Sequence, residues 1–121
     1  MSKKVLVVDD EHEVVSFLED FLRRFDLEVV SVTDASQALS DFKTHNPDFV
    51  FLDIQMPEKN GIEILRELKS FDPQVKVIMI TARHDEEYQV QAKQLGAIDY
   101  ITKPLDLGDL SKKIKKYILR R

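Results

Sequence analysis

The chain has 121 residues, 43% of them hydrophobic and 33% charged, which fits one globular domain with a buried core and excludes a disordered chain. A formal net charge of −4 gives no sign of nucleic-acid binding, and the absence of cysteine excludes disulfides and thiolate metal sites. No apolar run approaches the ~20 residues of a membrane span, and the segment before the first run is too short for a signal peptide, so we expect a cytoplasmic domain covering residues 1–121.

Short apolar runs alternate with helical patterns along the chain. The first run is at residues 4–8, and a helical stripe separates it from the second run at 28–32. A second stripe leads to the run at 48–52, a third to the run at 75–80, and a weaker helical segment to the last run at 99–101. A final stripe follows. The four stripes are Val14, Leu18, Phe21, Leu22 and Phe25; Ala35, Ala38, Leu39 and Phe42; Ile62, Leu65 and Leu68; and Leu107, Leu110, Ile114, Tyr117 and Ile118.

This alternation predicts an α/β fold. The runs at 4–8, 48–52 and 75–80 are nearly continuous in apolar residues, which is typical of central parallel strands covered on both faces. Five β–α units joined by short connections predict one parallel sheet with helices on both of its faces. The weak helical segment at 85–95 has few apolar residues, and the glycine of LGA marks its end.

Polar residues follow the predicted strands, at the edge where sheets of this kind bind ligands. Asp9 and Asp10 come after the first strand, Asp53 after the third, and Lys103 after the fifth, while the fourth strand ends at Thr81. Each of them also has an ordinary structural interpretation. The first helix has a candidate capping box, the MPEKNG segment is rich in turn residues, and threonine and lysine are common at strand ends and on surfaces. The capping box would pair Asp10 with Glu13.

The set of residues taken together favours a metal and phosphoryl site. Two like charges ~4 Å apart repel by roughly 4 kcal/mol at an effective dielectric constant of about 20, so three carboxylates in one crevice either take up protons or bind a cation. Ligands that are all oxygens suit Mg²⁺ better than zinc or copper. Lys103 adds a positive charge and Thr81 a hydroxyl group. Together with a bound cation, these groups could neutralise the negative charge on the oxygens of a phosphoryl group.

Four motifs in order, VLVVDDE, VFLDIQMPEKNG, VIMITA and LGAIDYITKP, resemble the receiver domain of bacterial two-component response regulators, the CheY-like proteins. The resemblance runs from residue 4 to about residue 119. It implies a flavodoxin-like, doubly wound five-stranded sheet with strand order 2-1-3-4-5. It also implies a phosphorylation-activated signalling switch that accepts its phosphoryl group from a sensor histidine kinase or a phosphotransfer protein. Such a domain is no enzyme, apart from catalysing its own phosphorylation and slow dephosphorylation.

The resemblance implies a role for each residue of the site. Asp53 is the phosphoacceptor, and Mg²⁺ is bound directly by Asp10, by Asp53 and by the backbone carbonyl of Gln55. Asp9 acts on the metal through a bound water, and Lys103 pairs with the phosphoryl oxygens.

The resemblance further implies a switch. Thr81 and Tyr100 form the switch pair, although the sequence alone favours Tyr100 as a half-buried packing residue, and only the resemblance makes it part of a switch. The change is expected on the face of the fourth helix, last strand and last helix, roughly residues 85–117, where an output domain or protein binds. The Lys103–Pro104 peptide bond is expected to be cis. By spacing, Gln55 and Arg83 border the approach of a hydrolytic water. The sequence alone favours a solvent-facing Arg83, and the hypothesis is that an Arg83 side chain placed over the site prolongs the phosphorylated state.

Two other functions fit parts of the pattern. A Mg²⁺-dependent aspartyl-phosphate phosphohydrolase typically has a second aspartate two residues after the acceptor, where this chain has Gln55. A flavin-binding module needs a phosphate-binding loop rich in serine, threonine or glycine after the first strand, where this chain has DDEHE. The basic segment KKIKKYILRR has an apolar stripe, so we expect an amphipathic helix with a solvated face, with no direct nucleic-acid binding and no membrane binding.

Overall fold

The computed structural model describes residues 3–82 and 86–119. Its strands are β1 (Lys4–Val8), β2 (Glu28–Val32), β3 (Phe49–Asp53), β4 (Lys76–Thr81) and β5 (Asp99–Thr102). Its helices are α1 (His12–Arg23), the 3₁₀ turn η1 (Ala35–Gln37), α2 (Ala38–His45), α3 (Gly61–Phe71), α4 (Glu86–Gln94), α5 (Leu107–Lys113) and the π-helical η2 (Ile114–Ile118), which continues α5. Within the described ranges, no helix has both the length and the apolar character needed to cross a membrane.

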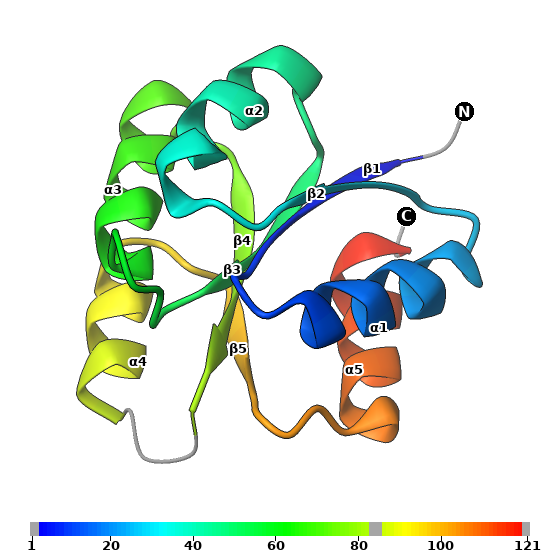
Figure 1. Cartoon of the computed structure of the whole chain (residues 1–121). Coiled ribbons are helices and arrows are strands. Elements are labelled where there is room, and N and C mark those ends of the chain that lie inside the picture. Colours follow the sequence, from blue (N-terminus) through cyan, green and yellow to red (C-terminus); the bar gives the residue numbers. More distant parts are fainter. Residues whose placement is uncertain (1–2, 83–85, 120–121) are drawn as a thin grey trace.

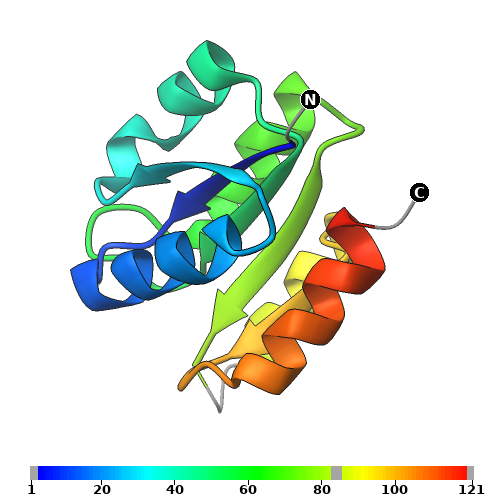
Figure 2. The same ribbon diagram turned by 90° about the vertical axis from the view of Figure 1, so that its right-hand side faces the viewer.

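The strands form one parallel sheet in the order β2-β1-β3-β4-β5, as expected. Figure 1 shows α2, α3 and α4 on one side of this sheet and α1 and α5 on the other. In Figure 2, α1 (blue) and α5 (orange to red) lie in front of the sheet. The predicted doubly wound architecture is therefore confirmed.

The core consists of two apolar layers, one on each face of the sheet. Successive strand residues point to opposite faces, so Leu6 and Val8 of β1 pack in the layer under α2 and α3, while Val5 and Val7 pack in the layer under α1 and α5. Every residue of β3 is buried. This explains why the central apolar runs are continuous, since such a strand has no solvent-facing side.

Two details differ from the prediction. The central strands β3 and β4 each lie one residue later than the apolar runs, so Asp53 is the last residue of β3 and does not follow it, whereas Thr81 ends β4 as predicted. The capping box of Asp10 and Glu13 is wrong, because α1 begins after Glu11 and no side chain caps its first turn. The Lys103–Pro104 peptide bond is cis, as the resemblance implies.

Candidate functional site

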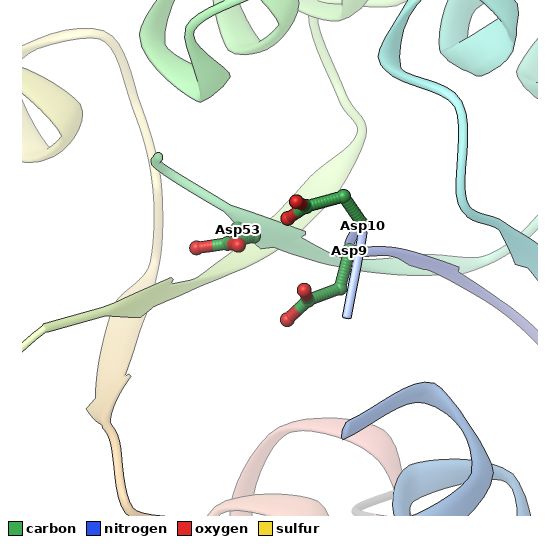
Figure 3. A group of neighbouring side chains, drawn as sticks. All are labelled: Asp9, Asp10 and Asp53. Atoms are coloured by element: carbon green, nitrogen blue, oxygen red, sulfur yellow. The ribbon is translucent and has the colours of Figure 1, made fainter. Parts of the chain in front are cut away.

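Three aspartates meet at the carboxyl edge of the sheet. Asp9 and Asp10 directly follow β1, and Asp53 ends β3, which is paired with β1 in register. Each offers one carboxylate oxygen, and these oxygens lie within 4.8 Å of one another. Figure 3 shows the three side chains projecting from the ends of the two strands into one region. Asp9 and Asp53 are buried, and Asp10 is partly exposed.

Local hydrogen bonds fix the two strand ends. The backbone N–H of Glu11 donates to Asp9 Oδ1 at 2.9 Å, which turns the chain from β1 into α1. After β3, the N–H of Gln55 donates to Asp53 Oδ1 at 3.3 Å, and the N–H of Gly61 donates to the carbonyl of Ile54 at 2.7 Å. Both carboxylates are thereby oriented by the backbone that follows them.

Lys103 brings positive charge to the aspartates from the loop after β5. Its backbone N–H donates to the Thr81 carbonyl at 2.8 Å, which extends the β4–β5 pairing. Its Nζ lies 3.2 Å from Asp9 Oδ2 and 3.3 Å from Asp53 Oδ2. It also forms a close ion pair with the carboxylate of Glu11, a residue that the sequence analysis does not assign to the site.

Burial and like charge shift the ionisation of the buried aspartates. Burial and the negative charge of Asp9 raise the pKa of Asp53, Lys103 opposes both effects, and the net result is a pKa of about 7. Burial also raises the pKa of Asp9. Burial by itself would lower the pKa of Lys103, but the hydrogen bond to Glu11 and the charges of Asp53 and Asp9 outweigh it, so the pKa is raised. One ammonium therefore does not fully compensate the carboxylates.

The site has the composition that a hard divalent cation requires. All three clustered ligands are carboxylates, which suit Mg²⁺. Asp9 Oδ2 is fully buried and accepts no hydrogen bond, although the Lys103 ammonium is near it. A buried carboxylate oxygen without a hydrogen bond is costly unless a positive charge satisfies it. The residues present thus fit a metal ion.

The two residues of the expected switch pair differ in exposure. Thr81 is fully buried at the end of β4, and its hydroxyl donates to the Ala82 carbonyl at 3.2 Å. Tyr100 on β5 is 38% exposed, so its side chain is partly open to solvent and partly covered. The ammonium of Lys113 lies 5.5 Å from the centre of its ring. Arg83, which was expected to border the site, lies outside the described residues.

Comparison with known proteins identifies this arrangement. Residues 5–115 match the family model of the response regulator receiver domain. The alkaline phosphatase synthesis transcriptional regulatory protein PhoP of Bacillus subtilis (strain 168) is 37% identical, over 100% of this chain and 50% of its own length. The chemotaxis protein CheY of the same organism is 36% identical, over 96% of this chain and 98% of its own.

Solved structures agree with these relatives. A CheY-like response regulator receiver domain protein from Methanospirillum hungatei JF-1 superposes with a TM-score of 0.90 at 29% identity, over 96% of this chain and 93% of its own. The chain spans about half the length of PhoP and of the transcriptional regulatory protein PrrA of Mycobacterium tuberculosis (strain ATCC 25618 / H37Rv). These relatives do not favour the phosphohydrolase alternative. The chain belongs to the response regulator receiver domain family, the phosphorylation-activated signalling switches of two-component systems.

Proposed function

We propose that Asp53 accepts a phosphoryl group from the phosphohistidine of a sensor kinase or a phosphotransfer protein. Receiver domains of this family interact with sensor kinases and output domains and use Mg²⁺ at an acidic pocket. The observation that carries the proposal is the position of Asp53, which is buried beside two further aspartates with the Lys103 Nζ 3.3 Å from its Oδ2. A cytoplasmic location stays a prediction.

The transfer needs no separate base, because an ionised carboxylate is itself the nucleophile. An Asp53 oxygen attacks phosphorus and forms the new P–O bond. The P–N bond of the phosphohistidine breaks, and its electron pair stays on the imidazole nitrogen. Lys103 neutralises charge that develops on the phosphoryl oxygens, which is the main catalytic requirement of such a transfer. In dephosphorylation a water oxygen attacks phosphorus, the bond between phosphorus and the Asp53 oxygen breaks, and inorganic phosphate leaves while the Asp53 carboxylate is restored. The domain thus catalyses both reactions on itself.

Asp10, Asp53 and the backbone carbonyl of Gln55 are the direct Mg²⁺ ligands in this proposal, and Asp9 acts through a bound water. Support comes from the clustered carboxylates and from the buried Asp9 Oδ2, which accepts no hydrogen bond and lies 3.2 Å from the Lys103 ammonium. Bound Mg²⁺ supplies the positive charge that lets three carboxylates and a phosphoryl group occupy one crevice.

Thr81 and Tyr100 are proposed to transmit the effect of phosphorylation from the site to the protein surface. The buried Thr81 hydroxyl turns from the Ala82 carbonyl to a phosphoryl oxygen, and the exposed ring of Tyr100 turns inward. The face formed by α4, β5 and α5, called the α4-β5-α5 face below, then changes and binds an output domain or protein. No direct contact of this chain with nucleic acid is part of the proposal.

The test is incubation with Mg²⁺ and acetyl phosphate followed by intact mass spectrometry. We expect one phosphoryl adduct that is absent when EDTA is present and absent in Asp53→Asn. The matched control is Asp20→Asn, which removes an exposed carboxylate of α1 and should keep the adduct. An adduct that persists in Asp53→Asn would show that another residue is the nucleophile.

A further inference from the structure

Among the described residues, the Lys103 ammonium has a third carboxylate partner, Glu11, beside the two buried aspartates of the site. Lys103 Nζ lies 3.2 Å from Asp9 and 3.3 Å from Asp53, and it also forms a close ion pair with Glu11. The contact joins the loop after β1 to the loop after β5, which are far apart in the sequence. Before phosphorylation, the Lys103 ammonium is thus shared between Glu11, at the mouth of the site, and the phosphoacceptor Asp53.

The side chain of Glu11 makes no other hydrogen bond or ion pair among the described residues. Glu11 is the N-cap residue of α1, but its side chain accepts no hydrogen bond from the helix. The turn after β1 depends on its backbone N–H, which donates to Asp9 and is kept by any substitution except proline. The Glu11 side chain is 57% exposed and that of Lys103 only 22%. Removing the carboxylate should therefore leave the fold intact.

A phosphoryl group on Asp53 would compete with Glu11 for the same cation. Lys103 has three N–H donors, and they face three carboxylates in this structure. A phosphoryl group adds negative charge beside Asp53 and needs one or more of these donors. The donor given up most readily is the one on Glu11, because its carboxylate is the most exposed of the three and water can replace the contact.

We propose that Glu11 is a positioning residue that holds the Lys103 ammonium at the mouth of the site and releases it when Asp53 is phosphorylated. This inference rests on the proposed function, in which Lys103 pairs with the phosphoryl oxygens. Glu11 then restrains the switch, because part of the Lys103 interaction must be broken for each phosphorylation. The exposed carboxylate sets how readily the domain accepts a phosphoryl group.

The first test needs neither metal nor phosphodonor. The ε-methylene resonance of Lys103 is followed by ¹H–¹³C NMR in the metal-free protein and is assigned by its loss in Lys103→Arg. It should shift in Glu11→Gln and stay in place in Glu13→Gln. Glu13 is the matched control, because it lines the same open groove beside Lys103 and makes no ion pair with it among the described residues. An unmoved resonance in Glu11→Gln would overturn the inference.

The second test measures the consequence. The second-order rate constant for phosphorylation by acetyl phosphate with Mg²⁺ should rise roughly 3- to 10-fold in Glu11→Gln, since a charge-assisted contact is replaced by a neutral one. Affinity for beryllofluoride should rise in parallel. Glu11→Asp keeps the charge on a shorter side chain, so its phosphorylation rate constant should lie between those of the unmodified protein and Glu11→Gln. An unchanged or lower rate in Glu11→Gln, or an equal gain in Glu13→Gln, contradicts the positioning role.

The two proposals fail in different ways. If the nucleophile is misassigned, the adduct persists in Asp53→Asn, whereas the Lys103 resonance still reports on Glu11. If only the role of Glu11 is wrong, the adduct stays on Asp53 and the Glu11→Gln rate equals that of the unmodified protein.

Discussion

At the scale of single residues, Asp53 has to satisfy two opposing requirements. A carboxylate attacks phosphorus only when it is ionised, yet burial raises the pKa of this group to about 7. Lys103 relieves part of that penalty, and the acidic cluster leaves room for a divalent cation to relieve the rest. The site is thus destabilised in the absence of metal, which is a common property of functional sites.

This destabilisation predicts a pH dependence. The pKa of Asp53 is raised from 3.8 to about 7 on folding, so the folded protein binds this proton more tightly than the unfolded chain. Stability is therefore highest below about pH 4 with respect to this group and falls as the pH rises toward and past 7. Asp53→Asn should raise the free energy of unfolding of the metal-free protein at pH 8 by up to about 4 kcal/mol, with little difference near pH 4.

Urea denaturation of both proteins without metal and with Mg²⁺ checks this expectation. Added Mg²⁺ should stabilise the unmodified protein more at pH 8 than at pH 5, because protons compete with the cation. If Asp53→Asn is no more stable than the unmodified protein at pH 8, the environment of Asp53 does not disfavour the ionised form of its carboxyl group.

Some residues of the candidate site can be predicted from the sequence, and others cannot. Asp9, Asp10, Asp53 and Lys103 are recognisable because parallel strands bring their carboxyl ends to one edge, so residues distant in sequence become neighbours. Glu11 carries no such signal, because its contact depends on the rotamers of two long side chains.

At the scale of elements, β3 and α3 meet unusually closely. The structure gives the Asn60-Gly61 pair, a turn signal in the sequence, two separate roles. Asn60 caps α3, with its Oδ1 accepting from the N–H of Ile62 at 2.7 Å. A Cβ on Gly61 would lie 2.1 Å from the backbone oxygen of Asp53. This contact of the α3 backbone with the β3 backbone leaves no recognisable pattern in the amino-acid sequence, so the sequence alone does not predict it.

The close approach makes Gly61→Ala a specific test. The added methyl group must push α3 away from the end of β3, and overpacking of this kind typically costs about 1–3 kcal/mol of unfolding free energy. Because the displaced atoms belong to Asp53, the rate of phosphorylation by acetyl phosphate should fall as well.

The control is Gly108→Ala in α5, where the Cβ would meet only Asp106 Oδ1 at 3.2 Å. A side-chain atom gives way more easily than backbone, so a small change in stability is expected. Denaturant unfolding and phosphorylation rates are measured for both variants, and equal effects would contradict the close packing of Gly61 on β3.

At the scale of the whole molecule, the helices are anchored unequally to the sheet. The buried residues of α1 are Val15, Leu18, Phe21 and Leu22, and those of α3 include Ile64, Leu65 and Leu68. Ala92 is the only buried residue of α4. The sequence already indicates this difference, because the segment at 85–95 has the weakest apolar stripe. Burial of apolar surface sets how firmly a helix is held, so we expect α4 to move at a low cost in free energy.

The link from the site to α4 and α5 runs through β4 and β5. Thr81 and Thr102 are paired in register, and two residues earlier Tyr100 pairs with Met79. The Lys113 ammonium donates to the Tyr100 carbonyl and lies 5.5 Å from its ring, so the expected movement of this tyrosine also affects α5. The acidic site and the α4-β5-α5 face are thus joined by a single pair of strands.

The last prediction follows from this arrangement. Beryllofluoride with Mg²⁺ should change the backbone amide shifts of α4, β5 and α5 strongly, because α4 is weakly anchored and Tyr100 is partly exposed. Amides of α2 serve as the internal control, since this helix lies on the same face of the sheet as α4 but beyond α3 (Figure 1). In Asp53→Asn none of these shifts should change. Shifts confined to the loops at Asp9, Asp53 and Lys103 would show a site that binds the phosphoryl analogue without passing a signal to the α4-β5-α5 face.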